Sequence, residues 1–288
     1  MSGNASAGAD KAGQNGWGEN VTVDINEGIA WITLNRPEKR NAVNPGIVYE
    51  MIAVLDALED DPRAEVLVIT GAGEAFSAGQ DLKEYFRDME KAPPMERERL
   101  YRSNAAWQWR RMMYYPKPTI AMVNGWCFGG AFQVLIGCDL AICSDDAEFG
   151  LSEINWGIIP AGIVTKSVSM VMSQRDAMYY IMTGETFKGE RAKELGLVNK
   201  SVPASELRAE TTKLANVLRN KNPHVLRGAK TAYHHVRNMS WDSALEYLMA
   251  KSDSTTMRDP ERGAKIGMGQ FLDDKTYKPG LEAYDRKR

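Results

Sequence analysis

The sequence contains few cysteines and few histidines, and this scarcity limits its chemistry. Its 288 residues include three histidines, no CxxC motif and three cysteines: Cys127, Cys138 and Cys143. Three cysteines cannot all pair with one another and are few for this length, so a disulfide framework is not expected and a reducing compartment is favoured. A zinc site built on histidine and cysteine has little to draw on, so we expect no metal.

An excess of one charge is also absent, since 36 Lys and Arg residues face 38 Asp and Glu residues, for a formal net charge of −2. No global positive field attracts nucleic acid or an anionic membrane, so neither is an expected partner, although a local basic pocket is compatible with this balance. No run approaches the roughly 18 apolar residues that span a bilayer. Residues 1–20 lack the basic and apolar parts of a signal peptide and predict a flexible tail. We therefore expect a soluble, cytoplasmic protein.

The chain does contain 43% hydrophobic residues, enough for a sizeable core. Alternating residues predict a β-hairpin over 21–34, and apolar spacing predicts a helix over 45–59. Further strands are expected at 66–70, 119–123 and 140–143. Further helices are expected at 95–113, 131–138, 174–182, 188–194, 204–218, 223–235, 241–252 and 259–271. This order predicts an α/β fold of repeated ββα units over 21–203, followed by a C-terminal helical region over 204–288.

Two glycine-rich turns each follow a predicted buried strand, at Ser77-Ala78-Gly79-Gln80-Asp81 and at Phe128-Gly129-Gly130-Ala131. A turn that opens a helix exposes backbone N–H groups without intrahelical partners, and such groups can hold an anion. Taken separately, each is better explained as a tight turn that needs positive φ. Neither matches a P-loop or a complete GxGxxG fingerprint, so they give little support to phosphate binding of those kinds.

Glu153 lies among apolar and aromatic residues in the stretch 149–157, FGLSEINWG. Burial in such surroundings raises a carboxyl pKa and suits the group to both giving and taking a proton near neutral pH. A lone glutamate in an apolar run is more often a paired or half-exposed structural residue. Its combination with two glycine turns favours a catalytic role.

Five blocks resemble the crotonase (enoyl-CoA hydratase/isomerase) superfamily, and they occur in the right order from about Val21 to the C-terminus. They are LNRPEKRNAV at 34–43, AFSAGQDL at 75–82, PTIAMVNGWCFGGAF at 118–132, CDLAICSDDAEFGLSEINWGI at 138–158 and TGETFKGERAKELGLVNKSVP at 183–203. Within the superfamily, segments 107–130, 150–158 and 270–284 are most similar to the p-hydroxycinnamoyl-CoA (feruloyl-CoA) hydratase/lyases. The resemblance implies the crotonase (ClpP/crotonase-like) fold and a C-terminal trimerisation region, hence a homotrimer or a dimer of trimers.

The resemblance also implies roles for individual residues. The backbone N–H groups of Gln80 and Gly130 match the oxyanion hole that binds a thioester carbonyl, and Glu153 matches the single catalytic acid/base. Three residues fall where the family cradles coenzyme A: Lys39, Ala78 and Leu82. Ser152 and Trp156, on either side of Glu153, join the expected substrate-binding residues. Because coenzyme A is part of the substrate, no separate cofactor is expected.

Two positions depart from the family pattern. Gln133 stands where simple enoyl-CoA hydratases carry a second glutamate and where the hydratase/lyases usually have a small hydroxyl residue. Tyr85 matches the first of two tyrosines that bind the substrate's 4-hydroxyl, but Met249 stands at the second position. Tyr247 lies two residues earlier, roughly 200° around a helix, so it should not substitute simply. Strict selectivity for a 4-hydroxylated ring is therefore in question, and Tyr85 is equally compatible with a surface or interface position.

The resemblance implies a lyase that hydrates a hydroxycinnamoyl-CoA and then cleaves it to an aromatic aldehyde and acetyl-CoA. The alternative is an enoyl-CoA hydratase or isomerase that stops before C–C cleavage, and Gln133 argues against its two-carboxylate form. Some crotonase-fold proteins are chiefly RNA-binding or scaffold modules. The near-neutral charge and the presence of Glu153 with both turns argue against that class.

Overall fold

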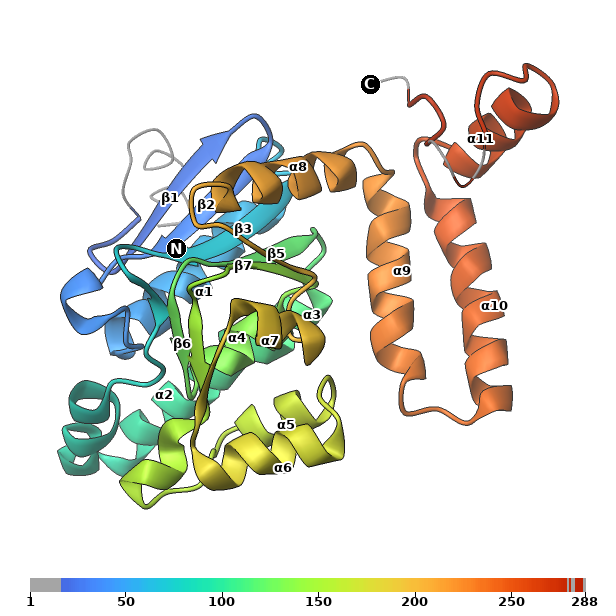
Figure 1. Cartoon of the computed structure of the whole chain (residues 1–288). Coiled ribbons are helices and arrows are strands. Elements are labelled where there is room, and N and C mark those ends of the chain that lie inside the picture. The colour runs from blue at the N-terminus through green and yellow to red at the C-terminus, as the bar shows by residue number, and fades with distance from the viewer. Residues whose placement is uncertain (1–16, 279, 281–282, 287–288) are drawn as a thin grey trace, which may run out of the picture.

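The structure is a computed structural model and describes residues 17–278, 280 and 283–286 (Figure 1). Residues 1–16 of the predicted flexible tail lie outside the described residues. Asn20, the last residue of the predicted tail, is anchored, because its backbone N–H and that of Val21 donate to Glu50 Oε2 at 2.9 and 2.8 Å. The first strand therefore starts against helix α1 (Pro45–Asp60), which carries Glu50.

Six strands form the larger sheet, in the order β1-β2-β3-β5-β7-β10. They are β1 (Val21–Asn26), β2 (Ile29–Leu34), β3 (Val66–Gly71), β5 (Thr119–Val123), β7 (Leu140–Ser144) and β10 (Lys200–Val202). β1 and β2 form the predicted antiparallel hairpin, and all other neighbours in this sheet are parallel. All residues of β3 and β5 are buried, as expected of parallel strands covered on both faces.

A second sheet of four three-residue strands is not among the predicted elements. Its order is β4 (Ala75–Ser77), β6 (Trp126–Phe128), β8 (Glu148–Gly150) and β9 (Thr186–Lys188). Such short strands, partly within glycine-rich segments, give no alternating pattern to recognise. β4, β6 and β8 each follow one strand of the larger sheet along the chain, namely β3, β5 and β7. The predicted repetition of strand pairs is thus present. The first strand of each pair lies in the larger sheet and the second lies in the smaller sheet.

Alternate strand residues face opposite sides of the larger sheet and create two cores. In β3, Leu67 and Ile69 join the larger core with α1, whereas Val66 and Val68 join a smaller core beneath α8 (Leu207–Arg219). The helix predicted over 95–113 is confirmed as a continuous run of α2 (Pro94–Ala105), the π-helical segment η4 (Ala106–Arg111) and α3 (Met112–Tyr114). The α-helices that follow, up to residue 200, are α4 (Ala131–Gly137), α5 (Val164–Ser169), α6 (Gln174–Thr183) and α7 (Gly189–Glu194).

Helices dominate the C-terminal part, as predicted. α9 (Pro223–Val236) and α10 (Trp241–Arg258) form an antiparallel pair beside the sheets, and α11 (Gly263–Leu272) follows (Figure 1). The helix predicted from residue 259 begins at 263, because Asp259 Oδ2 accepts the Gly263 N–H at 2.7 Å and closes the turn between α10 and α11. None of the helices in the described residues is long and apolar enough to cross a membrane.

The predicted boundary between core and helical region at residues 203 and 204 stays a prediction. α8, just beyond it, packs on the larger sheet, whereas no residue of α10 is buried. The C-terminal helices expose many large apolar side chains: Val225, Tyr233, Trp241, Leu245, Leu248, Met249, Met257, Met268, Phe271 and Leu272. This is far more apolar exposure than single surface residues of a monomer account for.

Candidate active site

The first glycine turn links β4 to the π-helical turn η2 (Leu82–Arg87). Gly79 has a φ of +85°, which glycine adopts without strain. Two hydrogen bonds flank Gln80: the Val43 N–H donates to the Gly79 carbonyl at 2.7 Å, and the Asp81 N–H donates to the Val43 carbonyl at 2.9 Å. The Gln80 N–H between them has no acceptor among the described residues. It is therefore available to a ligand.

The second turn links β6 to α4. The Gly129 N–H donates to the Gly150 carbonyl at 3.0 Å, whereas the Gly130 N–H has no acceptor in the part of the chain that the structure describes. The two turns touch, because a Cβ atom placed on Gly79 would lie 3.0 Å from the Gly130 nitrogen. Two unpartnered N–H groups, on Gln80 and Gly130, thus lie on segments in direct contact. Such a pair can bind an anionic oxygen.

The side chain of Gln80 lies over Gly130. A Cβ atom on Gly130 would stand 1.5 Å from Gln80 Oε1, so a larger residue at this position would displace the Gln80 side chain. Gln80 Nε2 donates to Gln108 Oε1 of η4 at 3.1 Å. This bond fixes the side chain, so the backbone N–H of Gln80 is the group left for chemistry.

Glu153 lies in a short 3₁₀ turn, η5 (Ser152–Trp156), that follows β8. A Cβ atom on Gly129 would stand 3.0 Å from Glu153 Oε1, which places the carboxyl against the second turn. Its Oε2 is buried and has no hydrogen-bond partner in the described chain. Burial raises the pKa of Glu153 above its ordinary value. A carboxyl of this kind beside two N–H donors can move protons on a bound molecule while the donors hold its developing negative charge.

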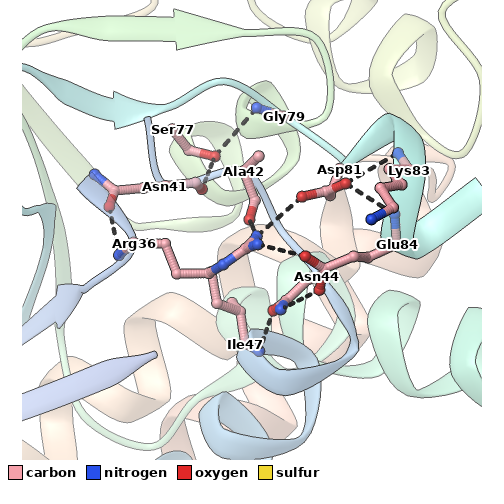
Figure 2. A network of polar contacts seen from close by, with 10 residues as sticks. All are labelled: Arg36, Asn41, Ala42, Asn44, Ile47, Ser77, Gly79, Asp81, Lys83 and Glu84. Carbon is pink, nitrogen blue, oxygen red and sulfur yellow. Dashed lines mark hydrogen bonds and ion pairs between the residues drawn. The ribbon is translucent and has the colours of Figure 1, made fainter. Parts of the chain in front are cut away.

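A buried guanidinium stabilises the first turn (Figure 2). Arg36 Nη1 donates to the Ala42 carbonyl at 2.6 Å and to Asp81 Oδ2 at 3.1 Å, and Nη2 donates to Glu84 Oε1 at 2.8 Å. The other oxygen of Asp81 accepts the N–H groups of Lys83 and Glu84 and so caps η2. Arg36 therefore connects the segment before α1 to Asp81 and Glu84, which follow the free N–H of Gln80.

Replacing Arg36 with methionine is expected to lower the free energy of unfolding by about 2–3 kcal/mol, because Asp81 then stays buried without its cation. Burial alone would raise the pKa of Asp81, but the Glu84 and Lys83 N–H groups and Arg36 together hold it below its ordinary value of 3.8. The stability that this adds is present above pH 3.8 and is lost as the pH falls through the lowered pKa.

Urea unfolding at neutral pH and at low pH measures both effects. Arg63→Met is the matched control, because the Arg63 side chain is 55% exposed at its ion pair with Asp61 and should contribute little to stability. Equal losses in the two variants would contradict the role of Arg36.

Most of the predicted site residues line one cavity of about 1220 Å³. It is lined by all the predicted residues except Met249: Lys39, Ala78, Gln80, Leu82, Tyr85, Gly130, Gln133, Ser152, Glu153 and Trp156. Tyr85 is 5% exposed, so it is not a surface aromatic. The individual roles of these residues stay predictions, but their proximity is a property of the structure.

A family model described as enoyl-CoA hydratase/isomerase matches residues 24–278. The chain belongs to the enoyl-CoA hydratase/isomerase family. It is 55% identical over 266 residues to a hydroxycinnamoyl-CoA hydratase-lyase of Pseudomonas fluorescens, covering 92% of this chain and 96% of that protein. It is 32% identical to a short-chain-enoyl-CoA hydratase of Clostridium acetobutylicum, covering 79% and 86%.

Solved structures agree with this assignment. An enoyl-CoA hydratase from Polaromonas superposes with a TM-score of 0.79 at 27% identity, covering 90% of this chain and 98% of that one. A second, from Geobacillus kaustophilus, gives a TM-score of 0.79 at 28% identity, covering 91% and 98%. These similarities confirm the predicted crotonase fold.

In this family member, Met249 does not lie at the cavity. It is 60% exposed on α10, which packs mainly against α9. Gln133 does line the cavity, and it is only 6% exposed. Its carboxamide faces Gly162, where an added Cβ atom would stand 3.3 Å from Nε2. The Gln133 amide thus lies in the cavity wall, at a position where the sequence departs from the family pattern.

Several lining residues are absent from the sequence-based site. The helix formed by α2 and η4 contributes Tyr101, Asn104, Ala105 and Trp109. The segment 95–113 is strongly charged, which favours a solvated helix, but these four residues are uncharged and recur at helical spacing. That uncharged stripe is the signal from which this wall could have been predicted.

Proposed function

We propose that this protein adds water to a hydroxycinnamoyl-CoA and then cleaves the product to an aromatic aldehyde and acetyl-CoA. The 55% identity to a hydroxycinnamoyl-CoA hydratase-lyase, over nearly the whole of both chains, is the observation that carries this proposal. The site supports it, because Glu153 and two free N–H groups border one cavity. With feruloyl-CoA as substrate, the aldehyde is vanillin.

In the hydration step, the N–H groups of Gln80 and Gly130 donate to the thioester oxygen and make the β-carbon electrophilic. The Glu153 carboxylate takes a proton from water, and the water oxygen bonds to the β-carbon. The electron pair of the C=C bond moves toward the thioester and forms an enolate. Glu153 returns its proton to the α-carbon, which gives a β-hydroxy thioester.

In the cleavage step, Glu153 takes the proton of the β-hydroxyl. The C–O bond becomes the aldehyde C=O, and the electrons of the Cα–Cβ bond form the enolate of acetyl-CoA in the same oxyanion hole. Glu153 protonates this enolate. Water and the enoyl thioester thus become an aldehyde and acetyl-CoA without net oxidation, and one carboxyl moves both protons.

Incubation with feruloyl-, 4-coumaroyl- and cinnamoyl-CoA tests the proposal. We expect an aromatic aldehyde and acetyl-CoA in equal amounts, detected by chromatography. If none of the three releases an aldehyde, the proposal is wrong. Turnover of crotonyl-CoA without aldehyde release would instead favour a hydratase or isomerase that stops before C–C cleavage.

The proposed substrate explains the modest charge of the site. Lys39, Ala78 and Leu82 line the cavity and are proposed to bind coenzyme A, so a local basic group is sufficient and a net positive charge of the whole protein is not required.

Proton transfer alone accounts for both steps, and we propose that no further cofactor takes part. A cytoplasmic location is proposed because Cys127, Cys138 and Cys143 are all free and buried thiols.

We further propose a homotrimer or a dimer of trimers, in which neighbouring chains cover the apolar side chains of α9–α11. Trp241 is 93% exposed and Met257 is 85% exposed in the single chain.

Light scattering after size exclusion is expected to give a mass of three or six times the 32.1 kDa of one chain. Trp241→Glu combined with Leu245→Glu should shift the protein to smaller species, whereas Glu246→Gln on the same helix should not. A monomeric wild-type protein would contradict this proposal.

A further inference from the structure

A second cavity, of about 450 Å³, lies between α9 and the rest of the fold. Its volume falls within the range of roughly 300–1,000 Å³ that is usual for small-molecule sites. In the described part of the chain, it shares no lining residue with the catalytic cavity. The wall opposite α9 is largely aliphatic and includes Leu135, Ile136, Leu140, Met170, Leu197 and Val198. The reaction proposed above makes no use of this space.

The wall that α9 contributes is cationic. Arg227, Lys230, His234 and Arg237 all line the cavity, and they follow one another at intervals of three, four and three residues. This spacing places them on one face of the helix. The face of a helix that is turned toward a protein core is ordinarily apolar. Here that face carries basic side chains, and the cavity separates them from the core.

Positive charge at this cavity exceeds negative charge. Lys117 lines it as well, so four lining side chains are cationic, whereas Asp139 is the one carboxylate among the described lining residues. Asp139 Oδ2 already accepts Lys230 Nζ at 2.9 Å and the Thr119 N–H at 2.8 Å. Burial lowers the pKa of Lys230, although Asp139 opposes this shift, and burial also lowers the pKa of Lys117. An anion in the cavity would balance this excess.

Two of these basic side chains have no hydrogen-bond partner among the described residues, namely Arg227 and His234. The others are occupied, since Arg237 Nη2 donates to the Met170 carbonyl at 3.0 Å and Lys117 Nζ donates to carbonyls at the end of α1. Burial lowers the pKa of His234, so its imidazole is neutral at physiological pH. Arg227 is exposed at the rim of the cavity. Its guanidinium is therefore the cation that an incoming ligand meets.

We propose that the cavity between α9 and the core binds an organic anion with an aliphatic body, of which a medium-chain carboxylate is the simplest form. The carboxylate pairs with the Arg227 guanidinium at the rim, where two parallel hydrogen bonds can form. The methylene chain lies along the aliphatic wall that Leu135 and Ile136 help to form. These two residues belong to α4, whose N-cap is Gly130, so the ligand contacts the helix that follows the second glycine turn.

Binding of decanoate to the full-length protein tests the proposal, at concentrations below its critical micelle concentration. Isothermal titration calorimetry gives the Kd, and the melting temperature should rise as decanoate is added. Hexanoate should bind more weakly, by up to about fourfold for each methylene group removed. Decan-1-ol has the chain without the charge and should bind about tenfold more weakly than decanoate.

Charge reversal identifies the cavity that is used. Arg227→Glu should weaken decanoate binding at least about tenfold, because it places like charges together, and Arg227→Gln should weaken it less. Arg175→Glu is the matched control, since Arg175 is an exposed arginine of α6 that lines neither cavity. Lys39→Glu reverses a charge in the catalytic cavity and should leave decanoate binding unchanged. Circular dichroism establishes that each variant is folded.

Three results would overturn the inference. The first is an absence of heat and of any rise in melting temperature with decanoate. The second is binding that Lys39→Glu abolishes and Arg227→Glu preserves, which would place the ligand in the catalytic cavity. The third is a smaller mass of Arg227→Glu in light scattering, which would assign this arginine to a contact with a neighbouring chain. None of these measurements depends on aldehyde release, so they stand apart from the test of the proposed function.

Discussion

Replacing Glu153 with glutamine is expected to lower kcat for aldehyde release by at least ~10²-fold, the usual loss when a general acid/base is removed. Glutamine has nearly the same shape but cannot take a proton from water or from the β-hydroxyl. The N–H groups of Gln80 and Gly130 stay in place, so substrate binding should change little. The loss is therefore expected in kcat and not in KM.

The same substitution should increase stability at neutral pH. Because burial raises the pKa of Glu153 above its ordinary value of 4.5, the folded protein holds the proton more tightly than the unfolded chain does. Stability is accordingly lost as the pH rises from 4.5 through the raised pKa, and it stays lower above that pKa. Glutamine removes this cost, so the free energy of unfolding should exceed that of the wild type at neutral pH and match it under acidic conditions.

Kinetics with 4-coumaroyl-CoA and urea unfolding at several pH values measure the two effects. Glu148→Gln is the control, because this carboxyl lies on the neighbouring strand β8, is partly exposed and lies 4.0 Å from Lys188. It should keep nearly full activity. If Glu153→Gln retains wild-type kcat, Glu153 is not the acid/base.

Replacing Gly79 with alanine is expected to lower kcat by about 10²–10³-fold, the cost of losing one oxyanion-hole donor. The added Cβ atom would lie 2.7 Å from the Phe128 carbonyl oxygen and 3.0 Å from the Gly130 nitrogen, and both of these are backbone atoms. The first turn must therefore move away from the second. The distance between the two free N–H groups changes, so they no longer converge on one oxygen.

A matched glycine separates this effect from backbone strain. Gly196 has a φ of +78°, similar to the +85° of Gly79, but its added Cβ atom would meet its nearest neighbour at 3.4 Å. Gly196→Ala should cost about 1 kcal/mol of stability and leave kcat unchanged. Unfolding curves and steady-state kinetics on both variants provide the comparison. A similar kcat in both would show that the contact of Gly79 with the second turn is unimportant.

Much of the fold follows from residue patterns of sufficient length. The hairpin over 21–34, the helix from Pro45 and the strands β3, β5 and β7 of the larger sheet lie where alternation, short apolar runs and helical spacing predict them. The edge strand β10 is not among the predicted strands. The smaller sheet could not be predicted in this way. Strands such as β4 and β6 contain three residues, and their pairing is determined by contacts between segments that are distant in the sequence.

The sequence predicts those parts of the candidate site in which the residue type itself indicates the local structure, such as a glycine in a tight turn. Gly79 and Gly129 have positive φ, and Glu153 lies in apolar surroundings, as the sequence indicates. The uncharged stripe of Tyr101, Asn104, Ala105 and Trp109 indicates a buried helix face, but not that this face borders the site. That position depends on the packing of α2 and η4 against the rest of the fold, which the helix's own sequence does not encode.

The order of the smaller sheet has a consequence for how such a site can change. β4, β6 and β8 are adjacent parallel strands, and Gln80, Gly130 and Glu153 each lie within three residues of the end of one of them. Neighbouring strands are about 4.8 Å apart, so two strand spacings, about 10 Å, separate the outer strands. Each repeat of the fold thus supplies one chemical group at a fixed interval. A substitution after β8 can replace the proton carrier while the two anion-binding groups keep their spacing, so new reactions can arise by exchanging one repeat's contribution at a time.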